Sequence, residues 1–149
     1  METKLKGDIA EQKVILKCLE FSRGVSIPIG DRLPYDLVID VHNSLFKIQV
    51  KSAWFDKNKN NWVVDNRRSL TNQKLSKKSK YTNNDFDFAI IVIEELNVFY
   101  IMPSDIFNSY GSEIHLIETT KRQRKPKSWN YREAWNLILH GAAEREISQ

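Results

Sequence analysis

The sequence predicts an α/β or α+β domain in which a mixed sheet of four to five strands lies between helices. Three observations predict it: a segment rich in helix formers near the N-terminus, a series of short apolar or alternating segments in the middle, and a periodic apolar pattern near the C-terminus. This order is that of a layered domain whose sheet is covered by helices. At 149 residues the chain can bury a core without disulfides or a structural metal, so residues 1–149 are expected to form a single domain.

The first helix is predicted over residues 8–21. This segment contains no Gly or Pro, and Gly24 follows as a natural helix C-terminal residue. Asp8 and Glu11 have the spacing of a capping box at a helix start. The alternative interpretation has Glu11 at the head of an apolar stripe, pointing toward the sheet. Residues 25–29 then predict a short strand, which a proline confines to a sheet edge or a strand end.

Residues 36–41 and 46–54 predict a β-hairpin, because the first segment is mostly apolar and the second alternates. Asn43 and Ser44 are expected to form its turn, since Asn tolerates left-handed backbone angles. In that register the apolar side chains form three cross-strand pairs: Val41 with Phe46, Ile39 with Ile48, and Leu37 with Val50. The opposite face then carries the polar side chains of both strands.

That polar face brings Asp36, Gln49 and Lys51 together at the end of the hairpin away from the turn, and it places Asp40 opposite Lys47. One interpretation is a solvated sheet face with exposed ion pairs, and it fits Asp40 and Lys47 best. The other interpretation, for Asp36 and Lys51, is an active site, because a proline fixes the strand entry and the chain is basic overall.

Further strands and a short helix are predicted in the second half of the chain. Residues 86–93 form a continuous apolar run, which is typical of a central strand covered on both faces. Residues 98–102 predict the next strand, and Ser104 is expected to cap a short helix that Gly111 ends. Residues 113–118 alternate and predict another strand.

The last helix is predicted from about residue 130 to residue 146. Five apolar side chains form one stripe along it: Tyr131, Ala134, Trp135, Ile138 and Ala142. We expect this stripe to be ordinary core, and a contact between subunits, with Trp129 nearby, is the alternative.

The charge distribution indicates a polyanionic partner. The net charge is +4 and the pI is about 9.1. Residues 56–84 carry six Lys and two Arg against two Asp, and residues 121–127 add five more positive charges. We expect residues 56–84 to be a basic insert, with at most a short strand at 62–65, that contacts nucleic acid; a flexible solvated loop is the alternative.

Several classes of protein are excluded by composition. The one cysteine cannot form an internal disulfide, and the three histidines are too far apart for a zinc-finger spacing. No segment approaches the roughly 20 apolar residues that cross a bilayer, and the N-terminus lacks the apolar stretch of a signal peptide. These features predict a cytoplasmic protein with no membrane partner, in a compartment that keeps thiols reduced.

Three short motifs carry a resemblance to a known family. "GDIAE" lies in the first helix, "PYD" enters the first strand of the hairpin, and "QVK" lies on its second strand. In this order they resemble the signature of the PD-(D/E)XK nucleases, and the run from "YTNNDFDFAIIVI" to "FYIMP" resembles the sheet of Holliday-junction-resolvase-like members. With its basic insert and a Gln in place of an acid, the chain is most similar to the group I intron-encoded homing endonucleases of this type in cyanobacteria. The resemblance implies a restriction-endonuclease-like core and site-specific cleavage of double-stranded DNA.

The resemblance implies four catalytic residues, namely Glu11, Asp36, Gln49 and Lys51. Asp36 is the expected primary ligand of Mg²⁺, for which Mn²⁺ can substitute, and Gln49 and the Val50 carbonyl are further ligands. Glu11 is expected to be a ligand or an acceptor that orients water. Lys51 is expected to position the nucleophile and stabilise charge on the phosphate. The resemblance also implies that cleavage leaves 5′-phosphate and 3′-hydroxyl ends. Because Gln49 carries no charge, the site is expected to hold metal more weakly than one with an acid there.

The basic insert supplies the expected DNA contacts, since Arg, Asn and Gln read bases and Lys neutralises phosphates. The expected base-reading residues are Asn66, Arg67, Arg68, Asn72 and Gln73, and the expected phosphate contacts are Lys57, Lys59, Lys74, Lys77, Lys78 and Lys80, with Arg122 and Arg124 as a second group. One such site cuts one strand. Cleavage of a duplex therefore predicts at least a symmetric dimer, and the resemblance suggests a homotetramer.

Two other functions fit the same motifs. A junction resolvase of this fold would prefer branched DNA and would not need the basic insert. A DNA-binding module would have lost cleavage together with its second acid. A preference for branched or linear DNA separates a junction resolvase from a homing endonuclease. Metal-dependent nicking separates both of these nucleases from a DNA-binding module.

Overall fold

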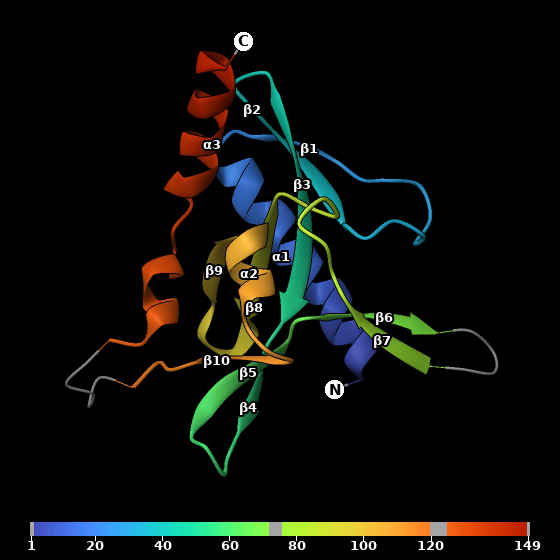
Figure 1. Ribbon diagram of the computed structural model, residues 1–149, viewed down its shortest axis with the longest axis vertical. Helices are drawn as coiled ribbons and strands as arrows, with labels where there is room; N and C mark the ends of the chain where they lie inside the picture. Colours follow the sequence, from blue (N-terminus) through green and yellow to red (C-terminus); the bar gives the residue numbers. More distant parts are fainter. Residues whose placement is uncertain (1, 72–75, 120–124, 149) are drawn as a thin grey trace.

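A five-stranded mixed sheet forms the centre of the protein in a computed structural model that describes residues 2–71, 76–119 and 125–148 (Figure 1). The strand order is β1 (Gly24–Ser26), β2 (Leu37–Val41), β3 (Ser44–Ser52), β8 (Phe88–Ile93) and β9 (Val98–Pro103). β3 and β8 are parallel, and the other neighbours are antiparallel. Every residue of β8 is buried, and β1 lies at the edge, so the central strand and the edge strand are both confirmed.

The two faces of this sheet are covered differently. On one face α1 (Thr3–Glu20) and α3 (Asn136–Ile147) pack their apolar side chains against β2, β3, β8 and β9. The other face is covered by α2 (Ser104–Ser109) and by a three-stranded sheet with the order β10 (Glu113–Leu116), β5 (Asn61–Asp65) and β4 (Trp54–Asp56). Two 3-10 helices, η1 (Glu94–Leu96) and η2 (Lys127–Tyr131), lie between these elements in the chain.

The basic segment is built of strands, so the alternative of a flexible loop is wrong for its described part. Val63 and Val64 of β5 are buried, because β5 pairs with β10 and closes over the second core. β6 (Arg67–Thr71) and β7 (Ser76–Lys80) then form a separate antiparallel hairpin, here called the β6–β7 arm. Figure 1 shows the arm extending away from the main sheet near the N-terminal end of α1.

Helix α1 corrects two predictions. It begins at Thr3, so Asp8 and Glu11 lie inside the helix and form no capping box. It ends at Glu20 because Ser22 takes a left-handed conformation with φ 60°, and the Arg23 amide then donates to the Cys18 carbonyl. Gly24, expected at the helix end, belongs to β1.

The β2–β3 hairpin turns one residue earlier than expected. His42 and Asn43 form the turn, with φ 49° and 65°, because a tight two-residue hairpin loop needs positive φ at both central positions. Ser44 therefore lies opposite Val41, and Leu37 lies opposite Ile48. The predicted pairing was off by two residues.

An even shift leaves every side chain on its predicted face, because the side-chain period of a strand is two. The apolar side chains stay in the core, and the polar face still holds the candidate catalytic residues. The ion pair expected between Asp40 and Lys47 is wrong, since Leu45 lies opposite Asp40 and the Lys47 ammonium donates to the Asn84 carbonyl at 2.8 Å.

Three predictions near the C-terminus also change. Ser104 is the first residue of α2 and does not cap it. Residues 113–116 pair with β5 in the second sheet. α3 begins at Asn136, because Glu133 turns left-handed with φ 51° while its amide donates to the Phe99 carbonyl at 2.7 Å. Ile138 and Ala142 are buried against the main sheet, and Trp135 packs beside them, which confirms this part of the stripe as core. Tyr131, Ala134 and Trp135 precede the helix, and Tyr131 packs against the core on the other face.

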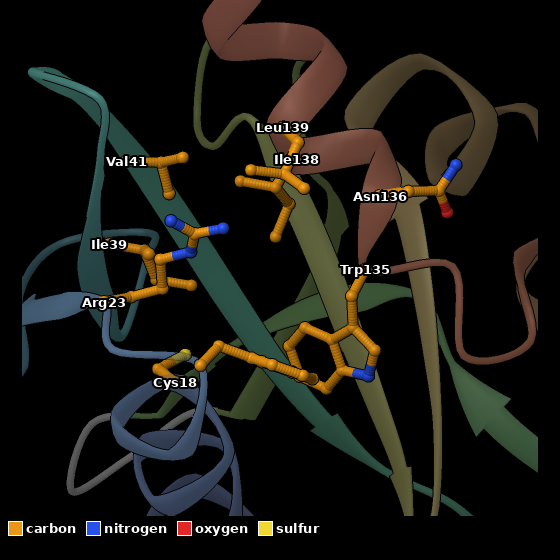
Figure 2. A pocket seen from close by; sticks show the side chains of 9 residues that line it. Cys18, Arg23, Ile39, Val41, Trp135, Asn136, Ile138 and Leu139 are labelled. Carbon is orange, nitrogen blue, oxygen red and sulfur yellow. The ribbon is translucent and has the colours of Figure 1, made fainter.

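A small apolar pocket lies between the C-terminal end of α1, strand β2 and α3 (Figure 2). Figure 2 shows Trp135 and Ile138 on the α3 side and Cys18 and Ile39 facing them. The Trp135 ring lies 5.3 Å from the ring of Phe21 and thereby links the two helices. None of the predicted site residues lines this pocket.

Candidate active site

The four predicted catalytic side chains lie in one groove. Glu11 comes from α1, Asp36 precedes β2, and Gln49 and Lys51 share a face of β3. The opposite wall of the groove is the β6–β7 arm with the end of β5, through Asp65, Arg67, Ser69 and Lys78. A second hollow, lined by residues 31–34 and Tyr81, shares Asp36, Gln49, Lys51 and Ser69 with the groove. The site therefore lies where two hollows meet, open to a long substrate.

Asp36 is held by main-chain hydrogen bonds at the point where β2 begins. Its amide donates to the Ile48 carbonyl at 2.8 Å, and its Oδ2 accepts from the Val50 amide at 2.8 Å. Continuing the observed register by one residue places Asp36 opposite Gln49. Burial raises the pKa of the Asp36 carboxyl. The hydrogen bond from the Val50 amide and the charge of Lys51 both lower this pKa, but burial outweighs them.

Glu11 faces the same space as Asp36. Burial raises the pKa of the Glu11 carboxyl, and the negative charges of Asp36 and then Asp8 raise it further. Two carboxylates that repel each other across a groove favour a cation between them. The interpretation in which Glu11 points toward the sheet and the site therefore fits the structure better than a cap.

Gln49 and Val50 supply neutral oxygen atoms beside the two acids. Gln49 is only 9% exposed, and its Nε2 donates to the Val50 carbonyl oxygen at 3.3 Å. The amide and carbonyl of one strand residue point to the same side of the strand, so the Val50 carbonyl lies on the Asp36 side. The Gln49 Oε1 remains as an acceptor.

This donor set fits a hard divalent cation. It consists of two carboxylates, one amide oxygen and one main-chain carbonyl, and Mg²⁺ and Mn²⁺ prefer oxygen ligands of this kind. Within the described ranges no three His, Cys, Asp or Glu side chains gather around a common point.

Lys51 is tied to the arm. Its ammonium donates to the Arg67 carbonyl at 2.8 Å and lies 5.2 Å from the centre of the Tyr81 ring. Burial lowers the pKa of Lys51, while the carboxylates of Asp65 and Asp36 oppose this shift. Sequence reasoning missed Tyr81 and Asp65 as site residues, because each lies near Lys51 only through the folding of the insert.

The predicted DNA contacts fall into three groups. Five of them, Arg67, Arg68, Lys77, Lys78 and Lys80, lie on the arm, and Lys57 and Lys59 are exposed in the turn between β4 and β5. Five others, Asn72, Gln73, Lys74, Arg122 and Arg124, lie outside the described residues.

Asn66 is a correction. Its side chain is fully buried, and its Nδ2 donates to the carbonyls of Phe107 at 3.2 Å and Tyr110 at 3.3 Å. It joins the arm to α2 and cannot reach a base edge from this position. A polar residue in a basic segment suggested a surface contact, but the fold uses the Asn66 amide as a buried donor to two carbonyls at the end of α2.

Similarity to known proteins agrees with this geometry. The PD-(D/E)XK endonuclease family model matches residues 1–138. The solved structure of a bacterial homing endonuclease, I-Ssp6803I, is 56% identical with a TM-score of 0.91, over 98% of this chain and 99% of that chain. The structure of MepB, at 14% identity and a TM-score of 0.42 over 85% of this chain and 93% of that chain, is too dissimilar to carry an argument. No curated protein matches significantly. Among the described residues, no helix is long and apolar enough to cross a membrane. The chain therefore belongs to the PD-(D/E)XK endonuclease family and has its restriction-endonuclease-like fold.

Proposed function

We propose that this protein is a site-specific endonuclease that cuts double-stranded DNA, of the homing type. The observation that carries the proposal is the meeting of Glu11, Asp36, Gln49 and Lys51 in one groove walled by the basic arm. The 56% identity to a bacterial homing endonuclease supports it. In this proposal residues 1–149 act as one nuclease domain, and the arm reads the target.

Each side chain has a distinct role in the proposed reaction. Asp36, Gln49, the Val50 carbonyl and Glu11 hold a divalent ion, Mg²⁺ or Mn²⁺, against the scissile phosphate. When bound, that ion activates water and stabilises the negative charge of the transition state. Lys51, whose ammonium is held in place by the Arg67 carbonyl, positions the nucleophile and lies ready to stabilise charge on the phosphate.

Gln49→Glu is expected to lower the Mg²⁺ concentration for half-maximal cleavage by about tenfold, because a charged ligand binds the ion more strongly than an amide. The variant loses the hydrogen bond from Nε2 to the Val50 carbonyl and places a third negative charge beside Asp36 and Glu11. Its melting temperature in EDTA is therefore expected to fall. Titrating Mg²⁺ in a cleavage assay of both proteins measures the first effect; an unchanged midpoint would remove Gln49 from the ligand set.

Lys77→Ala is expected to weaken binding to every DNA sequence and to flatten the plot of log affinity against log salt by about one unit. Lys77 is exposed on β7 and suits a phosphate contact. Lys17→Ala is the matched control, because it removes the same charge from α1 and leaves the arm unchanged. Equal slopes for wild type and Lys77→Ala would contradict a phosphate contact at this position.

Substrate shape tests the proposal against its nearest alternative. A homing endonuclease cuts a linear duplex at one sequence, whereas a junction resolvase cuts four-way junctions whatever their sequence. Matched linear and four-way substrates carrying the same sequences, incubated with Mg²⁺, compare the two directly. Preference for the junction would overturn the homing proposal and leave the endonuclease family assignment intact.

Cleavage of both strands requires more than one site. We propose that the protein acts as a dimer at least, and as a tetramer when it reads a long target, because one groove holds one set of catalytic residues. Its DNA target implies work in the bacterial cytoplasm. Sedimentation of the protein with and without a duplex measures the assembly.

A further inference from the structure

One carboxylate lies among the cations of the arm. Asp65, the last residue of β5, accepts hydrogen bonds from Arg67 Nε and Nη2, both at 3.1 Å, and from Lys78 Nζ at 2.6 Å. Arg67 lies on β6 and Lys78 on β7, so both strands of the arm are tied to the same acid. Burial disfavours the charged form of Asp65, but the hydrogen bonds from Arg67 and Lys78 outweigh burial and hold its pKa well below the usual range.

This cluster opens on the candidate active site. Asp65, Arg67 and Lys78 line the same groove as the catalytic side chains. Both cations are partly exposed there, with 35% of the Arg67 side chain and 46% of the Lys78 side chain accessible. A phosphate entering the groove thus meets two cations that already hold a carboxylate.

We propose that Asp65 is an intramolecular competitor of DNA, whose carboxylate occupies Arg67 and Lys78 in the free protein and must be displaced before DNA phosphates bind them. This inference rests on the proposed function, because it presupposes a DNA substrate in the groove. Any duplex that uses these two cations loses the same binding free energy to the displacement of Asp65, whatever its sequence. Random duplex binds mainly through its phosphates, so Asp65 is expected to keep that binding weak. A target that also makes base contacts along the arm binds tightly in spite of the same cost.

Asp65→Asn tests this competition with little change of shape. The Asn side chain keeps the size of Asp and an oxygen that accepts from the Arg67 amide, a bond of 2.9 Å in the structure. Binding to a random-sequence 30-base-pair duplex, a length of about three helical turns, is measured in EDTA by fluorescence anisotropy over a series of salt concentrations. Affinity is expected to rise about tenfold, and the salt slope to steepen by up to about two units, because two cations become available.

Glu113→Gln is the matched control. Glu113 lies directly opposite Asp65 on β10, is exposed, and has the His115 ring as its nearest partner, at 3.7 Å, so the same charge is removed next to the cluster and not within it. Little change is expected. A rise equal to that of Asp65→Asn would show a general effect of net charge and would overturn the proposal.

A double-mutant cycle with Lys78→Gln isolates the interaction between Asp65 and Lys78. In the Lys78→Gln background one of the two cations is gone, so Asp65→Asn should increase the logarithm of the affinity for random duplex by only about half as much as in wild type. Asp65→Ser, which retains an acceptor, replaces Asp65→Asn if thermal melting shows that the latter is unfolded. Unchanged or weaker binding of random duplex by a folded variant would overturn the proposal. A wild-type protein that binds no duplex at all would instead overturn the proposed function.

Discussion

Asp36→Asn is expected to abolish metal-dependent DNA cleavage, lowering the single-turnover rate by at least about 10³-fold. In the proposed mechanism, the substitution removes the primary negatively charged metal ligand, and Gln49 beside it carries no charge to replace it. An Asn oxygen still accepts from the Val50 amide, so the strand geometry of the 2.8 Å hydrogen bond is retained. The loss is therefore expected in catalysis and metal binding, with the fold unchanged.

Stability separates this loss from misfolding. Burial raises the pKa of Asp36, so the folded protein without metal disfavours the carboxylate, and at pH 7 the charge destabilises the fold. Asp36→Asn is expected to melt at the same or a higher temperature than wild type in EDTA. Asp40→Asn, an exposed change on β2 four residues further along the chain, is the control and should cut at the wild-type rate. A variant Asp36→Asn that still cuts within about tenfold would exclude Asp36 as the primary ligand.

Lys51→Ala is expected to reduce the single-turnover rate by about 10² to 10³-fold, because the proposed mechanism uses the Lys51 cation to stabilise charge on the phosphate. Binding is expected to change far less, since the arm carries five other cations, namely Arg67, Arg68, Lys77, Lys78 and Lys80. Single-turnover cleavage and equilibrium binding, measured on the same duplex, give the two effects separately.

Lys47→Ala provides the comparison on the same strand. Lys47 lies on the same face of β3 as Gln49 and Lys51, but its ammonium donates to the Asn84 carbonyl outside the groove. Its cleavage rate should stay within about twofold of wild type. If both lysine variants cut equally well, Lys51 has no role in the chemistry.

The candidate site was predictable where it depends on local periodicity. Gln49 and Lys51 share a face because they are two residues apart on one strand. Asp36 lies on the same face as long as the pairing of β2 with β3 differs from the predicted register by an even number of residues. The turn at His42 and Asn43 shifted the pairing by two, so the partner of Asp36 changed and its face did not.

What surrounds the site depends on contacts that periodicity does not encode. Lys51 meets the Arg67 carbonyl only because β5 turns back over the second core and the arm begins beside the groove. Asn66 shows the same limit, since its residue type suggests a surface contact and the fold places it under α2. Side-chain identity predicts what a residue can bind, and long-range packing decides what it reaches.

The most direct measurement is incubation of a random-sequence duplex DNA library with the purified protein in Mg²⁺, Mn²⁺ or EDTA, beside Lys51→Ala and Asp36→Asn. We expect discrete fragments with wild type in Mg²⁺ or Mn²⁺, all from one recovered sequence, and none in EDTA or with either variant. Tight binding without cleavage under any metal would contradict it, and would mean that the site with Gln49 in place of an acid holds DNA but no longer cuts it.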